Sequence, residues 1–190
     1  MSERNIVYFD LETRRSAAEV GGWHRADLMG MSVGVTYSTK DKAYHIYTED
    51  QAEELIEEMR SADLVVGFNH IGFDYQVLQP FTFWTLADAT RNLDICLDLG
   101  NKLGHRVNLD SIAKVTLGGL SKTAKGTDAL KWWAEYEKTG EPKPMMDIAY
   151  YCCYDVKVTM EVYLYGAKNG YVLYENKQGE IAEIPVDWKI

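Results

Sequence analysis

The first half of the chain contains short apolar runs separated by polar segments, a pattern typical of β-strands. The run from Asn5 to Phe9 is rich in β-branched and aromatic residues and predicts a buried strand. Met29 to Tyr37 and Ala43 to Tyr47 predict two more strands, and the polar segment Ser38 to Lys42 between them predicts a turn. We therefore expect the first three strands to form an antiparallel meander.

After these strands the periodicity changes and predicts helices. From Glu49 to Met59, the residues Leu55, Ile56 and Met59 fall on one face of an otherwise acidic segment. Further helices are predicted through Tyr75, Val77 and Leu78 up to Pro80, over Leu109 to Leu117, over Thr127 to Tyr136 and over Met146 to Lys168. Further strands are predicted at Leu64 to Phe68, at Asn92 to Cys96 and as a pair around the turn Lys177 to Gly179.

The order of these elements predicts the fold class. Strands come first and are followed by alternating helices and strands, which favours an α/β domain over residues 1–190. We expect a mixed central sheet, antiparallel in its first three strands and parallel afterwards. Helices are expected on both of its faces, and a β-hairpin at the C-terminus.

Composition excludes several classes of protein. The 190 residues are 46% hydrophobic, which suffices for a core, and no run approaches the roughly 20 apolar residues of a membrane span. The charged start of the chain is unlike a secretory signal, so we expect a cytoplasmic protein without a membrane partner. Three cysteines, Cys96, Cys152 and Cys153, predict neither a disulfide framework nor a structural zinc site.

The charge is acidic overall but unevenly distributed. Lys and Arg number 20 against 29 Asp and Glu, for a net charge of -9, which argues against a polyanionic partner. Residues 91–131, however, hold seven basic and four acidic residues. This stretch contains the side chains that we expect to contact phosphates, namely His105, Arg106, Lys114, Lys122 and Lys125.

Two acids follow the first predicted strand. The alternation of side chains along a strand puts Asp10 and Glu12 on the same side of the backbone. Adjacent carboxylates repel each other, and a divalent metal would offset their charge. A turn with two solvated acids remains the alternative at this point.

Two more acids stand out further along the chain. Asp74, in the segment GFNHIGFDYQVL, either interacts with a helix N-terminus or points into a cleft. Asn69 in the same segment is either a turn residue or an amide that contacts a ligand. Asp155 lies within the long C-terminal helix, and Tyr151 lies four residues earlier on the same face. Either the two share a hydrogen bond on a solvent-facing stripe, or a metal or donor offsets a buried carboxylate.

Together, the segments FDLET, GFNHIGFD and YYCCYD resemble the three motifs of the DEDD exonuclease family in the ribonuclease H-like superfamily. The resemblance covers nearly the whole chain and extends to stand-alone exonuclease domains of bacterial and phage origin. The chain resembles the tyrosine-bearing branch of the family, because the histidine-bearing branch would place a histidine where this chain has Tyr150. The adjacent Tyr150 and Tyr154 leave the assignment of Tyr151 less secure than that of the acids.

This resemblance implies a 3′–5′ exonuclease that uses two divalent metal ions, Mg²⁺ or Mn²⁺. Asp10, Glu12 and Asp155 would hold the metal that carries the attacking water, and Asp10 would bridge to a second metal with help from Asp74. Tyr151 would orient the water rather than act as an unassisted base, since an unperturbed tyrosine ionises near pH 10. The expected substrate contacts are Leu11, Thr13, Asn69, His70, Phe73, Arg106 and Lys122.

The expected substrate is a nucleic acid with a free 3′ end. We expect single-stranded DNA, with RNA left open because discrimination at the 2′-hydroxyl depends on loop geometry. Whether a helicase or polymerase partner presents the end is also open. Two alternatives are an aspartyl-phosphate phosphatase with Asp10 as nucleophile and a non-catalytic nucleic-acid-binding module. The phosphatase pattern D-x-D-x-T has Glu12 in place of its second Asp here, and the retained acids disfavour the binding module.

Overall fold

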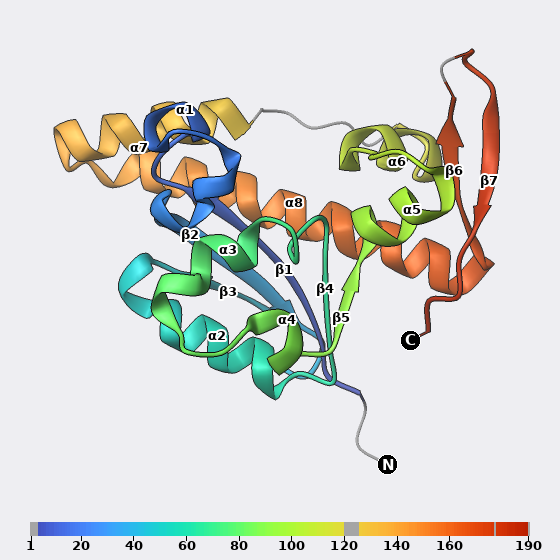
Figure 1. Ribbon diagram of the computed structural model, residues 1–190, viewed down its shortest axis with the longest axis horizontal. Coiled ribbons are helices and arrows are strands. Elements are labelled where there is room, and N and C mark those ends of the chain that lie inside the picture. Colours follow the sequence, from blue (N-terminus) through green and yellow to red (C-terminus); the bar gives the residue numbers. More distant parts are fainter. Residues whose placement is uncertain (1–3, 120–125, 177, 190) are drawn as a thin grey trace.

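The computed structural model describes residues 4–119, 126–176 and 178–189 (Figure 1). Its main sheet has five strands in the order β3-β2-β1-β4-β5. The strands are β1 Ile6–Thr13, β2 Met31–Ser38, β3 Ala43–Tyr47, β4 Leu64–Gly67 and β5 Asn92–Asp94. The pairs β1–β2 and β2–β3 are antiparallel, whereas β1–β4 and β4–β5 are parallel. The predicted mixed sheet and its opening meander are therefore confirmed.

Helices and short 3₁₀ turns connect and cover the strands. The α-helices are α1 Ala17–Val20, α2 Ala52–Ser61, α3 Asp74–Leu78, α4 Leu86–Ala89, α5 Ile95–Leu103, α6 Leu109–Thr116, α7 Gly126–Thr139 and α8 Pro142–Asn169. The 3₁₀ helices are η1 Trp23–Leu28, η2 Glu49–Gln51 and η3 Gln79–Phe81. No helix among the described residues is long and apolar enough to span a membrane.

Several predicted boundaries differ from those in the structure, and two of the differences have a clear physical reason. The first strand does not end at Phe9 but continues to Thr13, because Leu11 is buried and residues up to Thr13 pair with β2. The predicted strand from Asn92 to Cys96 ends at Asp94, where the unpredicted helix α5 begins. The Asp94 carboxylate accepts the backbone N–H of Leu97 and so caps this helix.

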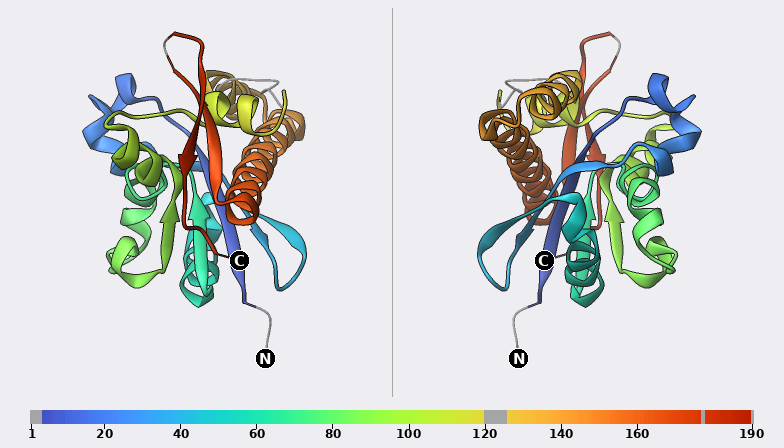
Figure 2. Two further views of the ribbon diagram at one scale, coloured as in Figure 1. Left: turned by 90° about the vertical axis from the view of Figure 1, so that its right-hand side faces the viewer. Right: turned by 90° about the vertical axis from the view of Figure 1, so that its left-hand side faces the viewer.

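The sheet lies between two helical layers, and alternate residues of β1 face opposite sides. Ile6 and Tyr8 share a core with Val156 of α8, whereas Val7 shares a second core with Leu55 of α2. Figure 2 shows the sheet with α8 on one side and α2 and α3 on the other. Helices on both faces of the sheet are thus confirmed, and α8 runs across the face from which Asp10 and Glu12 project.

The C-terminal segment forms the predicted hairpin, with β6 Tyr171–Glu175 antiparallel to β7 Ile181–Pro185. It follows directly on α8, which ends at Gly170 with the left-handed φ of 78° that glycine favours. The Thr116 side chain on α6 holds the hairpin by exchanging hydrogen bonds with the backbone of Leu173. The chain then returns to α8, where the Trp188 ring stacks on Tyr163.

Candidate active site

Three carboxylates from two distant parts of the chain meet beside the sheet. Asp10 and Glu12 continue the alternation of β1 that turns Tyr8 toward α8, so both side chains face that helix. Asp155 projects from the middle of α8 and is buried. One carboxylate oxygen from each of Asp10, Glu12 and Asp155 lies within 4.8 Å of the other two.

Three carboxylates at this spacing are a suitable donor set for a hard divalent cation. Mg²⁺ and Mn²⁺ prefer oxygen ligands, and a cation would offset the mutual repulsion of the three charges. The long side chain of Glu12 and the short one of Asp10 come from the same face of β1. The residues present therefore fit a divalent metal.

Asp74 lies in the same pocket as these acids but outside the cluster of three. It is the first residue of α3 and is 4% exposed, and its Oδ1 accepts the backbone N–H of Leu11 at 3.2 Å. Burial raises the pKa of the Asp74 carboxyl to about 7, although the N–H groups of Asp74 and Leu11 act in the opposite direction. A bound cation would favour the charged form of this carboxyl.

Of the three neighbouring tyrosines in α8, Tyr151 is the one that lines the pocket. Its side chain is 5% exposed and its ring meets the ring of Trp132 edge-on, with centroids 6.4 Å apart. Tyr150 is 72% exposed and does not line the pocket, and neither does Tyr154. Because Tyr151 and Asp155 are one helical turn apart, both point toward β1.

The pocket that contains these residues has a volume of about 810 Å³. Ten of the twelve site residues expected from the sequence line it, namely Asp10, Leu11, Glu12, Thr13, Asn69, Phe73, Asp74, Arg106, Tyr151 and Asp155. They come from β1, from the segment after β4, from the loop before α6 and from α8. The fold therefore brings together residues up to 145 positions apart in the sequence.

The two remaining site residues expected from the sequence are His70 and Lys122. The expected substrate contact of His70 is wrong, because its side chain is fully buried and its Nε2 lies 3.1 Å from Oδ1 of Asn92. Its ring fills the space beside Gly67, where an added Cβ would approach Nδ1 to 2.6 Å. Lys122 lies outside the described residues, as does Lys125.

The pocket also contains an aromatic residue that was not among the expected site residues. Trp23, at the start of η1, is 73% exposed and lines the pocket. Its ring meets the ring of Phe73 edge-on, with centroids 5.7 Å apart. The pair Gly21-Gly22 before Trp23 is a sequence signal for a turn, and both glycines have positive φ in the structure.

Comparisons with known proteins show the family and a similar fold. Residues 7–165 match the sequence model of the RNase_H_2 family, described as RNase_H superfamily. Among solved structures, the fold is similar to the family B DNA polymerase from the hyperthermophilic archaeon Pyrobaculum calidifontis, with a TM-score of 0.60 and 12% identity. That match covers 86% of this chain but only 24% of the polymerase chain. No curated protein matches in sequence. Because the family match covers most of the chain, including most of β1 and of α8, the protein belongs to the RNase H superfamily.

Proposed function

We propose that the protein is a metal-dependent 3′–5′ exonuclease that releases nucleoside 5′-monophosphates from nucleic acid ends. One observation carries this proposal. The carboxylates of Asp10, Glu12 and Asp155 converge within 4.8 Å in a pocket that Tyr151 and Asp74 also line. Membership of a superfamily of nucleases with this fold supports the same reaction class.

Two divalent ions, Mg²⁺ or Mn²⁺, are the cofactors of this proposal. Asp10, Glu12 and Asp155 would hold one ion, and Asp10 together with Asp74 would hold the second. Such ions supply a nucleophilic hydroxide and stabilise the charge that develops on the phosphate and the leaving oxygen. All the proposed ligands are carboxylates, as expected for hard cations that retain bound water.

The role of Tyr151 is to orient the attacking water. Its side chain lies on the same face of α8 as Asp155 and lines the same pocket, so a water held at that carboxylate would face the phenol. Burial of both side chains restricts their rotation.

The remaining lining residues suit the 3′-terminal nucleotide. Leu11, Thr13, Asn69 and Phe73 offer apolar, hydroxyl and amide contacts at the wall of the pocket. Arg106 supplies a cation for a phosphate. We propose single-stranded DNA as the substrate, and the similarity of the fold to part of a DNA polymerase supports DNA. RNA is the alternative substrate. The proposal also includes a helicase or polymerase partner, which would present the 3′ end to the site.

The proposal is tested with 5′-labelled single-stranded DNA, duplex DNA and RNA of one sequence, incubated with Mg²⁺ or Mn²⁺. A ladder of single-nucleotide steps, absent in EDTA, is the expected result on single-stranded DNA. Internal cuts alone would instead indicate an endonuclease of the same fold. Hydrolysis of p-nitrophenyl phosphate without action on any oligonucleotide would indicate a phosphatase.

The site itself is tested with Asp10→Asn and Asp155→Asn, which keep the shape of each side chain and remove its charge. Both variants should lose at least about 99% of the activity, because each removes the negative charge of a proposed metal ligand. Circular dichroism verifies that they remain folded. Undiminished Mg²⁺-dependent activity in both would contradict the proposal.

A further inference from the structure

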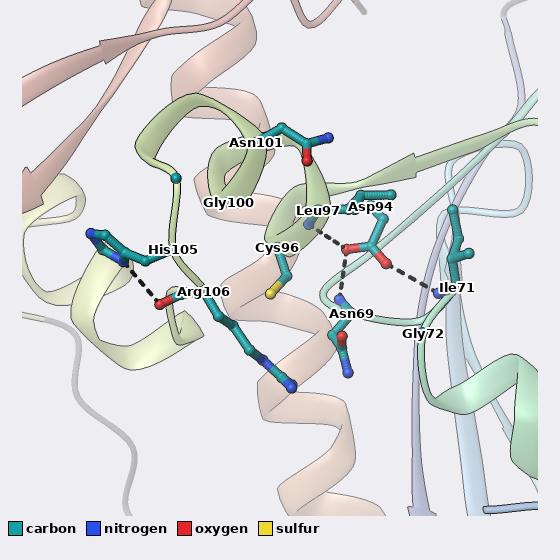
Figure 3. Close-up of a pocket in the computed structure, with 11 residues that line it drawn as sticks. Asn69, Ile71, Gly72, Asp94, Cys96, Leu97, Gly100, Asn101, His105 and Arg106 are labelled. Carbon is teal, nitrogen blue, oxygen red and sulfur yellow. Dashed lines mark hydrogen bonds between the residues drawn. The ribbon is translucent and has the colours of Figure 1, made fainter. Parts of the chain in front are cut away.

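The β4–α3 loop, residues 68–73, is held by one buried carboxylate from the neighbouring strand. Asp94 ends β5, which lies parallel to β4, and is 5% exposed. Its Oδ1 accepts the backbone N–H of Asn69 at 2.8 Å, and its Oδ2 accepts that of Ile71 at 3.1 Å (Figure 3). Oδ1 also accepts the N–H of Leu97 at 3.1 Å, so the carboxylate joins the loop to the first turn of α5.

The charge of Asp94 is stabilised by these N–H groups rather than by His70. The Nδ1 of His70 lies 3.7 Å from Oδ2 of Asp94. The Nε2 of the same ring lies 3.1 Å from the Oδ1 acceptor of Asn92, so the proton belongs on Nε2. Burial lowers the pKa of His70 and keeps its ring neutral. Hydrogen bonds to a charged carboxylate are roughly twice as strong as neutral ones, so the loop is firmly held.

The held loop sets the direction of the Asn69 side chain. The φ of Asn69 is 66°, a left-handed conformation that is uncommon for residues other than glycine. Its N–H is bound by Asp94, and its carbonyl oxygen accepts the N–H of Phe73 at 3.0 Å. Figure 3 shows its amide extending away from Asp94, and Asn69 lines the active-site pocket. The backbone therefore aims this amide before a substrate binds.

We propose that Asp94 is a positioning residue for the nuclease site, which holds Asn69 in its left-handed conformation so that the amide meets the substrate. This inference rests on the proposed exonuclease function. Asp94 lines a second pocket, of about 540 Å³, together with Asn69 and Arg106. Among the described residues it is not one of those that line the active-site pocket. Asp94 therefore acts on the substrate through Asn69.

The test uses two variants, Asp94→Asn and Asp94→Ser. Asparagine keeps the shape of the side chain but replaces one acceptor oxygen with an NH₂ group and removes the charge. Serine is one bond shorter, so it can cap α5 in place of Asp94 while it releases the loop, and it should remain folded. Circular dichroism verifies folding at the assay temperature.

The expected effect is weaker substrate binding. If the released loop is competent to bind about one tenth of the time, KM for single-stranded oligothymidylate rises about tenfold. The value of kcat should change less than about threefold, because Asp74 is held separately by the N–H of Leu11. The control is Asn108→Ala, which removes the side-chain cap of α6 outside both pockets and should leave KM and kcat unchanged. A fall in kcat without a rise in KM in the Asp94 variants would overturn the inference.

A double-mutant cycle distinguishes positioning from a general loss of structure. Asn69→Gly removes the amide, and glycine adopts a positive φ without help. In this background Asp94→Ser should raise KM by no more than about twofold, because no amide is left to aim. If the two effects on KM multiply instead, Asp94 does not act through Asn69 and the inference is overturned.

Binding provides a readout independent of hydrolysis. Fluorescence anisotropy of labelled oligothymidylate in Ca²⁺ should give a Kd about tenfold weaker for both Asp94 variants than for wild type or Asn108→Ala. If no oligonucleotide is hydrolysed but this difference persists, the positioning role is supported and the proposed function fails. If wild type hydrolyses the strand and the Asp94 variants match it in Kd and KM, the inference is overturned and the proposed function stands.

Discussion

The thiol of Cys152 on α8 lies 3.4 Å from both the backbone carbonyl oxygen and Oδ2 of Asp10 on β1, and donates to them. Cys152 is fully buried. Burial, and then the carboxylates of Asp10 and Glu12, raise the pKa of this thiol well above its usual value. The sulfur therefore keeps its proton and acts as a donor beside the carboxylate cluster. In the sequence, Cys152 lies between Tyr151, which we propose orients the water, and Asp155.

The first prediction concerns Cys152→Ala, which removes this donor. Hydrogen-bonded neighbours of metal ligands orient them, and their loss commonly weakens metal binding about tenfold or more. We expect the apparent Kd for Mn²⁺, measured by titration calorimetry, to rise about tenfold. Cys152→Ser, which keeps a donor, should restore most of the affinity. Cys153→Ala, at a half-buried neighbouring position, is the control. Equal affinity in Cys152→Ala and wild type would show that the thiol does not position Asp10.

The second prediction concerns metal-linked stability at Glu12. A ligand present at 100 times its Kd stabilises the folded state by about 2.7 kcal/mol, so saturating Mn²⁺ should raise the Tm of wild type by roughly 5–10 °C. Glu12→Gln removes one charge from the cluster of three and should reduce that rise by at least half. Glu53→Gln, at an exposed position on α2, should retain the full rise. Differential scanning calorimetry with Mn²⁺ and with EDTA measures the rise in Tm for each variant. An undiminished rise in Glu12→Gln would show that Glu12 does not bind the metal.

The third prediction is a pH dependence of stability from Asp74, measured without metal. Its pKa is raised from 3.8 to about 7 by burial, so folding favours the protonated form. The stabilisation is complete below about pH 4 and is lost as pH rises through about 7. Asp74→Asn cannot ionise and retains an oxygen for the N–H of Leu11. The difference between the Tm of Asp74→Asn and the Tm of wild type should therefore increase by about 2–10 °C, in favour of the variant, from pH 4 to pH 8 in EDTA. Parallel curves for the two proteins would contradict this assignment.

The fourth prediction concerns the packing of the C-terminal segment on α8. A Cβ added at Gly166 would approach the Trp188 ring to 2.5 Å, and that ring is held by its Nε1–H donating to Asp98 at 2.9 Å. We expect Gly166→Ala to lower the free energy of unfolding by about 1–3 kcal/mol, because overpacking outweighs a gain of about 1 kcal/mol in helix propensity. At Gly100 in α5 the closest atom would lie at 3.5 Å, so Gly100→Ala should be neutral or stabilising. Urea denaturation compares the two, and an equally stable Gly166→Ala would contradict the expected clash.

Much of the fold could be predicted because its signals are local. The range of β3 was predicted to the residue, and the burial of Leu55, Ile56 and Met59 on α2 follows directly from their spacing. Helix α5 was missed because the apolar run around Ile95 and Cys96 suits a strand as well as a helix over so short a length. Its capping by Asp94 is local, whereas the hydrogen bonds from the backbone N–H groups of Asn69 and Ile71 to the same carboxylate depend on tertiary structure.

The sequence by itself determined the residue types of the candidate site. The motifs name the four acids and Tyr151, and period two places Asp10 and Glu12 on one side of β1. Tertiary structure alone decided which of these groups meet. It packs α8 across β1, brings Asp155 within 4.8 Å of the first two acids and leaves Asp74 outside that cluster. It also buries His70, opens a second pocket beside Arg106 and places the Cys152 thiol against Asp10. Side-chain periodicity specifies the face of an element, but only the packing of distant elements brings two faces together.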